Sequence, residues 1–348
     1  MKRILGLGAA CFGLMACGGD PDQVDPASDE ARSNCPPPSA CDLAAPTVRG
    51  TGSWDHPIAS RLTVAEGSAR HRGRDNFARV GQPQWAIAKF AYGIADKDLE
   101  DETVDVWVAR DCRTWERLGS TRTLSDGQGS TIEGVPANGG RVYFQIPAAK
   151  ALGVGRHRLH FVVRADGSTA DSVIDVLPAN ARVAVSDVDG TLTSSEWAAL
   201  GAIITSRPPA AHPGAPEALW ALARRGYHIF YLTARPEWLE PTTRAWIRLR
   251  GFPPGIVHTT TGSTGALNGA AQTFKEEELN ALAARLGRVP DYGFGNRASD
   301  VATYTGLGIT ASHAYYYQLS GEDLRGGNYL ADYRTLVTPF SALPLVCR

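Results

Sequence analysis

The pattern of apolar residues changes near residue 181, and this change divides the chain into two kinds of structure. Between about 50 and 178, apolar and polar residues alternate with a period of two, as in 104–108, 142–146 and 159–163. Such alternation is typical of strands with one buried face. Turn sequences containing Asp-Gly or Asn-Gly separate the runs. Short strands joined by turns favour an all-β sandwich of roughly immunoglobulin size.

Beyond residue 181, apolar strands alternate with helical segments. The expected strands are 182–186, 227–232, 292–294 and 314–317, and the expected helices are 217–225, 237–250 and 274–286. This alternation predicts a parallel sheet covered by helices. We therefore expect an immunoglobulin-like β-sandwich domain at 49–179 and an α/β domain with a Rossmann-like parallel sheet at 180–348.

The charge balance excludes one class of partner. The 348 residues include 35 Lys and Arg and 36 Asp and Glu, so the net charge is −1. Proteins that bind nucleic acids usually carry a basic excess, so we expect no nucleic-acid partner. The basic stretch 70–74 could contact anionic headgroups, but a solvated loop is its default interpretation.

The N-terminus predicts export. A basic start precedes the apolar run 4–14, which is too short to span a bilayer as a helix. The following Leu-Met-Ala-Cys resembles the lipobox of bacterial lipoproteins, whose signal is cut before a lipid-bearing cysteine; an ordinary signal peptide is the alternative. We expect a signal peptide at 1–16, lipidation at Cys17 and a polar tether at 17–48. The resemblance implies a protein anchored by lipid at the bacterial cell envelope, and Gly18 favours the outer membrane.

Four cysteines would remain besides the lipidated one: Cys35, Cys41, Cys112 and Cys347. An oxidising compartment favours disulfides, and four cysteines allow three pairings. The short spacing favours Cys35–Cys41, which leaves Cys112–Cys347 to join the two halves of the chain. Free thiols are the alternative, because neither a Cys-x-x-Cys pair nor histidines at ligand spacing indicate a metal site.

Two carboxylates follow the first strand of the α/β region. Asp187 and Asp189 belong to the sequence Asp-Val-Asp-Gly-Thr, in which Gly190 allows the chain to turn away sharply. Ligands of open α/β sheets bind at the carboxyl ends of the strands. A carboxylate pair at this edge can hold a hard divalent cation or attack phosphorus. A simple Asp-Gly turn is the alternative.

Further polar residues are expected at the same edge. Thr233 ends the second strand, and its hydroxyl can bind a phosphoryl oxygen. Lys275 is expected at the start of a helix, where its ammonium group could neutralise developing charge. Asn296 and Asp300 follow the third strand and could complete an oxygen cage for Mg²⁺. Each residue alone has an ordinary explanation, but the four in this order favour phosphoryl chemistry.

This order of motifs resembles the haloacid-dehalogenase superfamily and, within it, the catalytic domain of lipin-type phosphatidate phosphatases. The motifs that carry the resemblance are 187–193, 231–235, 274–275 and 294–297, with Asp300 and Tyr304. The Gly-Asn-Arg-x-x-Asp element is the most telling of them. The resemblance covers about 181–325, and a related domain ends the membrane-associated phosphatidylinositol transfer proteins.

The resemblance implies roles for single residues. Asp187 would be the nucleophile, and Asp189 would be the general acid and then the general base. Thr233 and Lys275 would bind the phosphoryl group. The other implied roles are Mg²⁺ ligation by Asp187, the backbone carbonyl of Asp189 and Asn296 or Asp300, orientation of Asp189 by Thr191, and loop or headgroup contacts by Arg235 and Arg297.

The main functional expectation is a phosphatase. It would be a Mg²⁺-dependent phosphomonoester hydrolase that forms an aspartyl-phosphate and converts phosphatidate to diacylglycerol at a membrane surface. The stretches between the motifs are too short for a lid domain, and an open site near a lipid anchor favours a phospholipid substrate. Two alternatives remain: a phosphatase of a soluble phosphomonoester, and a non-catalytic phosphatidic-acid-binding module.

Overall fold

The computed structural model describes residues 34–194 and 208–347. The expected signal peptide at 1–16 and the expected lipidation site at Cys17 lie outside the described residues. From residue 35 onward the chain forms one compact unit. The change of pattern near residue 181 therefore separates two architectures that pack against each other.

The first architecture is a β-sandwich. Its three-stranded sheet has the order β1 (Arg72–Arg74), β3 (Trp85–Lys89), β8 (Arg141–Gln145). Its five-stranded sheet has the order β2 (Asn76–Arg79), β10 (Thr169–Leu177), β9 (Gly155–Val163), β6 (Thr103–Arg110), β7 (Thr114–Arg122). The small pair β4 (Ala91–Tyr92) and β5 (Lys97–Asp98) and the 3₁₀ turn η1 (Ala148–Lys150) complete it. Apolar residues of both larger sheets share one core, so the expected sandwich is confirmed.

One helix in this region was not expected. Helix α2 (Pro57–Ala65) begins with a proline, which is well tolerated in the first turn of a helix. Ser60 and Thr63 are buried, whereas Ile58 and Leu62 are exposed. Because the buried face is polar, the helix lacks the apolar period that identifies a helix from sequence.

The second architecture is a six-stranded, fully parallel sheet. Its order is β13 (Ile256–His258), β12 (Tyr227–Leu232), β11 (Arg182–Asp187), β14 (Tyr292–Gly295), β15 (Ala314–Tyr317), β16 (Asn328–Leu330). Its helices are α3 (Ala215–Arg224), α4 (Glu240–Leu249), α5 (Asn268–Leu286), α6 (Ala298–Leu307) and α7 (Arg334–Ser341), with 3₁₀ turns η3 (Glu237–Leu239) and η4 (Ala311–His313). The expected parallel α/β arrangement is confirmed.

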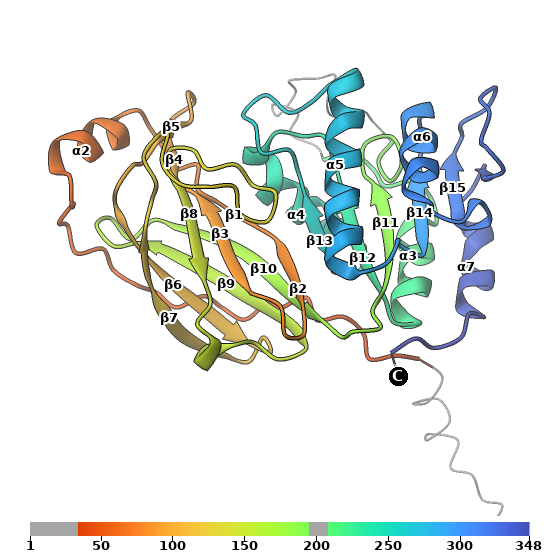
Figure 1. Ribbon diagram of the computed structural model, residues 1–348, viewed down its shortest axis with the longest axis horizontal. Helices are drawn as coiled ribbons and strands as arrows, with labels where there is room; N and C mark the ends of the chain where they lie inside the picture. Colours follow the sequence, from red (N-terminus) through yellow and green to blue (C-terminus); the bar gives the residue numbers. More distant parts are fainter. Residues whose placement is uncertain (1–33, 195–207, 348) are drawn as a thin grey trace, which may run out of the picture. The chain divides into compact units, whose positions relative to one another are not determined.

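Helices cover both faces of the parallel sheet. Successive residues of β12 alternate between two cores: Tyr231 packs with α3, α4 and α7, whereas Phe230 packs with α5 and α6. Figure 1 shows α5 and α6 together on the near face of the sheet. Burial on both faces explains why these strands read as continuous apolar runs.

The strand register brings the ends of the central strands together. Asp187, the last residue of β11, lies opposite Leu232 of β12, and Ser186 lies opposite Phe294 of β14. Thr233, Asp189 and Asn296 therefore leave the sheet at the same edge. This is the edge at which open α/β sheets bind ligands.

The β-sandwich covers the edge strand β13 of the parallel sheet. Asp75 is fully buried, and its carboxylate accepts hydrogen bonds from the N–H of Val173 in the sandwich (2.9 Å) and of Val257 in β13 (3.2 Å). His258 Nε2 lies 2.9 Å from the backbone oxygen of Asp75. An exposed edge strand invites unwanted pairing, so this cover also protects the sheet.

The basic stretch 70–74 belongs to this interface. The expectation of a solvated loop was wrong, since Arg72 and Arg74 are only 3% and 2% exposed. Arg74 donates to the backbone oxygen of Thr259 (3.1 Å) and forms an ion pair with Glu278 (2.6 Å). Arginines are buried in this way when carboxylates or carbonyls receive their donors.

Glu240 is a buried carboxyl of the same interface. Its Oε1 accepts a hydrogen bond from the N–H of Asp75 (3.0 Å), but no described residue donates to its Oε2. Arg244 sits nearer to Asp75 (2.5 Å) than to Glu240 (3.8 Å). Burial therefore raises the pKa of Glu240 to about 8, despite the opposing charge of Arg244.

We expect Glu240→Gln to flatten the pH dependence of stability. In the unfolded chain this carboxyl loses its proton near its ordinary pKa of 4.5, whereas the folded protein keeps it to about 8. The stabilising contribution is full below the unfolded pKa and is lost as pH rises through the folded one. Between pH 5 and 8 the loss should be about 3 kcal/mol. Urea unfolding at pH 5 and pH 8 measures this loss, and Glu116→Gln, at a partly exposed position, is the control. If the free energy of unfolding changes between the two pH values by the same amount in Glu240→Gln and in wild type, the assignment is refuted.

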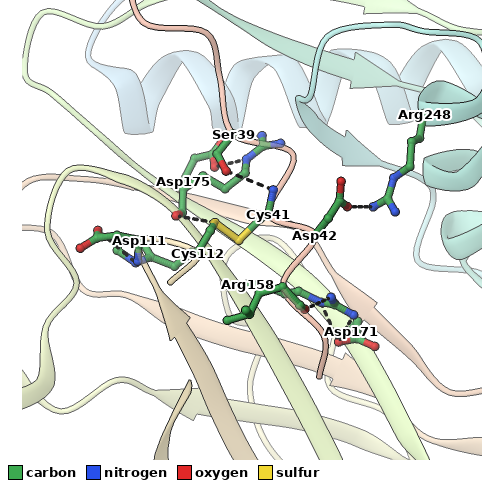
Figure 2. Close-up of a disulfide and its surroundings, with 12 residues drawn as sticks. Ser39, Cys41, Asp42, Asp111, Cys112, Arg158, Asp171, Asp175 and Arg248 are labelled. Atoms are coloured by element: carbon green, nitrogen blue, oxygen red, sulfur yellow. Dashed lines mark hydrogen bonds and ion pairs between the residues drawn. A yellow bond between two sulfur atoms is a disulfide. The ribbon is translucent and has the colours of Figure 1, made fainter. Parts of the chain in front are cut away.

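Two disulfides tie the N-terminal segment to both architectures. They join Cys35 to Cys347 and Cys41 to Cys112, so the pairing expected from the sequence was wrong. Figure 2 shows Cys41 and Cys112 beside the ion pair of Asp42 with Arg248 (3.0 Å). Sequence proximity misled here because the segment is extended between two different partners: Cys35 joins the C-terminal Cys347, whereas Cys41 joins Cys112 in the turn after β6.

Candidate functional site

A glycine turn opens the candidate site at the end of β11. Gly190 has φ +78°, and a Cβ at this position would lie 2.2 Å from Nδ2 of Asn296. Only glycine combines this backbone conformation with such a close approach. The turn therefore brings the loop after β11 against the loop after β14, as the sequence predicted for Asp187, Asp189 and Asn296.

Lys275 joins two carboxylates inside the site. Its Nζ lies 2.7 Å from Oδ1 of Asp187 and 2.7 Å from Oδ1 of Asp300. All three side chains are buried. The residue lies in the middle of α5, so the expectation that it starts a helix was wrong. Both carboxylates raise the pKa of Lys275, which keeps the ammonium group charged despite its burial.

Asp187 carries a perturbed carboxyl. Its second oxygen accepts a hydrogen bond from the hydroxyl of Thr191 (2.9 Å). Burial, together with the negative charges of Asp300 and Asp189, raises the pKa of Asp187 to about 6, although Lys275 opposes the shift. The carboxylate is therefore charged at neutral pH but close to its titration range.

Asp189 is held by two donors. The guanidinium of Arg235 donates from Nη2 to Oδ1 (2.7 Å) and from Nε to both oxygens (3.1 Å each). The hydroxyl of Thr233 donates to Oδ2 (2.7 Å). Thr233 and Arg235 thus both contact Asp189, a pairing that the sequence did not reveal. Charge-assisted bonds of this kind fix the orientation of the carboxylate.

Asp300 has a structural position. Besides Lys275, its carboxylate accepts the N–H groups of Asn296 (2.9 Å) and Arg297 (3.0 Å), and it closes a capping box at the start of α6. Both of its oxygens therefore already have partners. The exposed Arg297 is the N-cap residue of the helix.

The Thr191 hydroxyl lies between two oxygen acceptors. It is 2.9 Å from Oδ2 of Asp187 and 3.0 Å from Oδ1 of Asn296. A hydroxyl has one proton and can donate to only one acceptor at a time. One acceptor of this pair therefore keeps lone pairs available for a cation or a donor.

Sequence reasoning missed two residues that support the loop after β11. The hydroxyl of buried Tyr333 donates to the backbone oxygen of Thr191 (3.0 Å), and Nε2 of His212 lies 3.1 Å from that of Gly190. Tyr333 lies 142 positions beyond Thr191 in the sequence, and no local pattern marks it. His212 follows a residue that forms a β-bridge with Thr193, a contact that a single sequence does not indicate.

Models of known protein families match both parts of the chain. A model of the LNS2 domain of PITM 1-3 matches residues 184–318, and a model of the beta-sandwich domain of PITM 1-3 matches residues 69–176. Both matches point to one protein type. They fall on the α/β part and the β-sandwich separately and in the order seen here.

Curated proteins give the same result. The chain is 28% identical over 264 residues to membrane-associated phosphatidylinositol transfer protein 1 of Homo sapiens and 26% identical over 260 residues to protein retinal degeneration B of Drosophila melanogaster; each match covers 74% of this chain and 19% of the relative. It is 29% identical over 249 residues to human membrane-associated phosphatidylinositol transfer protein 2, which covers 71% of this chain and 17% of the relative. The chain therefore spans about a fifth of the length of these relatives.

These matches correct the identification made from motifs. The resemblance to lipin-type phosphatidate phosphatases was wrong, and so was the expectation of a phosphatase or other hydrolase, because the relatives are named as phosphatidylinositol transfer proteins. Motif order alone did not separate the two families. The second match, at 69–176, falls on the β-sandwich that the sequence predicted at 49–179, outside the motifs.

The location inferred from the N-terminus is corrected as well. The three relatives named above are animal proteins, and two of them are named membrane-associated, which overturns the expectation of a bacterial lipoprotein at the outer membrane. Within the described residues, no helix is both long and apolar enough to cross a membrane.

Proposed function

We propose that this chain is a non-catalytic phospholipid-binding module whose α/β part takes the phosphate of phosphatidic acid at the carboxyl edge of its sheet. The proposal keeps the haloacid-dehalogenase-like arrangement, with Asp187 at the end of the inner strand β11, as a scaffold for binding. The names of the relatives, which are phosphatidylinositol transfer proteins, support a phospholipid ligand. The expected partner is therefore a phospholipid at a membrane surface.

The observation that carries the proposal is the set of hydrogen bonds that Asp189 accepts. A carboxyl that protonates a leaving group must hold a proton and then give it up. Both oxygens of Asp189 instead accept hydrogen bonds from Arg235 and Thr233, so neither faces the site without a partner. Release of these donors would have to precede any acid catalysis. The arrangement therefore supports recognition of a phosphate more than its hydrolysis.

The depth of the site favours a terminal phosphate. Asp187 and Lys275 are 4% and 6% exposed, so a ligand must reach inward to contact them. The phosphomonoester of phosphatidic acid carries no further headgroup and can enter with three free oxygens. A phosphodiester would have to bring its second substituent into the same space. Depth thus supports phosphatidic acid over diester phospholipids.

Charge argues for a divalent cation as a co-ligand. The carboxylates of Asp187, Asp189 and Asp300 outnumber the cations Lys275 and Arg235 by one, so the site is net negative. A dianionic phosphate is repelled by such a site unless a cation neutralises it. We propose Mg²⁺, which prefers oxygen ligands and commonly bridges carboxylates to phosphates.

The available oxygens limit which residues would hold Mg²⁺. Within residues 34–194 and 208–347, no group of three or more His, Cys, Asp and Glu side chains is arranged to hold a metal. Asp187 and Asn296 fit, because they share the single proton of the Thr191 hydroxyl. The backbone carbonyl of Asp189 would complete the set, whereas Oδ2 of Asp300 already accepts two backbone N–H groups and its Oδ1 pairs with Lys275.

Vesicle sedimentation tests the proposal with the full chain. The chain should bind vesicles of phosphatidylcholine that contain phosphatidic acid about tenfold more tightly in Mg²⁺ than in EDTA. In Mg²⁺, it should also bind them about tenfold more tightly than vesicles of phosphatidylcholine alone. Asp187→Asn removes a cation ligand and one negative charge, so its binding should no longer depend on Mg²⁺. Asp126→Asn, in a sandwich turn, is the matched control.

Two outcomes would overturn this function. The first is equal sedimentation with and without phosphatidic acid. The second is stoichiometric release of inorganic phosphate from the same vesicles, which a binding module does not produce. Vesicles that contain phosphatidylinositol in place of phosphatidic acid separate recognition of a terminal phosphate from attraction to any anionic lipid.

A further inference from the structure

Three cations stand side by side across the smaller sheet of the β-sandwich. Arg72 of β1 lies opposite Lys89 of β3, which lies opposite Arg141 of β8. Residues directly opposite each other in an antiparallel sheet point to the same face, and like charges in such positions repel. This row is stable only if anions are supplied to its face.

Two of the anions come from the sandwich itself. Asp96 accepts two hydrogen bonds from Arg72 (2.6 and 2.7 Å), and Asp98 forms an ion pair with Lys89 (2.8 Å). Arg141 is completely buried, and the carboxylate that it pairs with belongs to the α/β part. That carboxylate is Glu237.

Glu237 accepts hydrogen bonds from both ends of the cation row, Arg72 and Arg141, and we call these three residues the clamp. Both terminal nitrogens of Arg141 donate to its two oxygens, and Nε and Nη2 of Arg72 each donate to Oε2 at 3.3 Å. The side chain is 1% exposed. Although burial raises the pKa of Glu237, the charges of Arg141 and Arg72 outweigh it and hold the pKa below its usual value. The clamp is therefore a charged one.

The clamped residue continues the loop that forms the phosphate site. Glu237 lies two residues beyond Arg235 and four beyond Thr233, the two residues that hold Asp189. The backbone oxygen of Arg235 accepts the N–H and the hydroxyl of Thr260 (3.0 Å each). The N–H of Glu237 donates to the backbone oxygen of Gly262 (3.1 Å). The loop is thus fixed at one end by Asp189 and at the other by the β-sandwich.

We propose that Arg72 and Arg141 are positioning residues for the phosphate site. By holding Glu237, they set Arg235 and Thr233 against Asp189, so the site has its binding geometry only when the β-sandwich is docked on the α/β part. This inference rests on the proposed function for its consequence in lipid binding, but the clamp itself can be tested without lipid. It gives the β-sandwich a role in the ligand site of its neighbour.

The test uses the full chain with Arg141→Met. Amide hydrogen exchange should become about tenfold faster for residues 233–239 and 260–266, and stay unchanged in the sandwich core at 104–108. Binding to phosphatidic-acid vesicles in Mg²⁺ should weaken about tenfold. Arg285→Met is the matched control, because Arg285 makes another ion pair between the two parts, with Glu133 (2.9 Å), and its hydrogen bonds go to Asn76 and Phe77 rather than to this loop. It should leave exchange of the loop as in wild type.

A conservative variant separates positioning from general stability. Arg141→Lys retains one positive charge beside Glu237 and should restore most of the exchange protection and affinity that Arg141→Met loses. Unchanged loop exchange in Arg141→Met, or equal loop exchange in Arg141→Met and Arg285→Met, overturns the clamp. If wild type itself fails to distinguish vesicles with phosphatidic acid, the proposed function fails, and the exchange data still decide for or against the clamp.

Discussion

Lys275→Met is expected to lower the free energy of unfolding at pH 8 by about 3–5 kcal/mol, the usual cost of removing one partner from a buried ion pair. The ammonium group lies 2.7 Å from both Asp187 and Asp300. Without it, two buried carboxylates would face each other with no cation between them. Protonation relieves this repulsion, so the deficit should shrink at pH 5. Urea unfolding at the two pH values measures both effects.

Lys275→Met should also abolish the binding of phosphatidic acid in Mg²⁺. The site would then carry two net negative charges in place of one, and these would repel the phosphate more strongly. Lys150→Met is the matched control, since this lysine pairs with Glu116 (3.2 Å) at a partly exposed position where ion pairs contribute little. The second variant, Lys275→Met with Asp300→Asn, should recover part of the stability. A deficit below about 1 kcal/mol for Lys275→Met would mean that the triad is not a stabilising unit.

The sequence predicted which residues meet at the site but not how they pair. Asp187, Asp189, Thr233 and Asn296 could be placed together because the carboxyl ends of parallel strands share one edge. The bond from Arg235 to Asp189 depends on the conformation of the loop after β12, which no periodic pattern encodes. That pairing supports the binding function proposed above, whereas the expectation of a phosphatase was overturned by the relatives.

Elements with a clear apolar pattern were predicted well. The boundaries of β12 and β15 agree with the expected ranges, because both strands are largely apolar runs. Helix α5 begins at Asn268, six residues before the expected start, because its first turns are polar and small. The short strands β13 and β16 have three residues each, too few for any period to appear.

The interface between the two architectures could not be predicted from local sequence. Arg72, Arg74 and Arg141 look like surface residues because arginines are almost never buried unless they are paired. Glu278 lies 204 positions from Arg74, and Glu237 lies 165 positions from Arg72 and 96 from Arg141. Pairing over such distances is a property of the tertiary fold, and it is also what couples the sandwich to the site.

The N-terminal segment shows the same dependence on distant partners. Residues 35–39 line a cavity of about 520 Å³ together with residues of β10, β12 and the C-terminus. The N–H of Cys35 donates to the backbone oxygen of Arg224 at the end of α3 (2.7 Å). Arg158 of β9 donates to the backbone oxygen of Leu43 (2.8 Å). The segment therefore bridges the two architectures, and its disulfides fix both of its ends.

Removal of these disulfides is the second large effect that we expect. Cys35–Cys347 closes a loop with a sequence separation of 312, and Cys41–Cys112 one of 71. In the chain-entropy description, closing loops of this length restricts the unfolded chain enough to stabilise the fold by about 4 kcal/mol for the shorter loop and about 6 kcal/mol for the longer one. Each disulfide is removed by a double substitution, Cys35→Ser/Cys347→Ser or Cys41→Ser/Cys112→Ser. Both variants should unfold at a lower urea concentration than wild type, and the first variant at the lower concentration of the two.

The two variants should also differ in where amide hydrogen exchange becomes faster. Loss of Cys35–Cys347 frees the segment from the α/β part, so amide exchange should rise at the end of α3, where Cys35 donates to Arg224. Loss of Cys41–Cys112 frees it from the turn between β6 and β7 and should raise exchange there. Treatment of wild type with dithiothreitol should reproduce the sum of both patterns. If reduced and oxidised protein unfold at the same urea concentration, the disulfides do not restrict the unfolded chain and the segment is held by its hydrogen bonds alone.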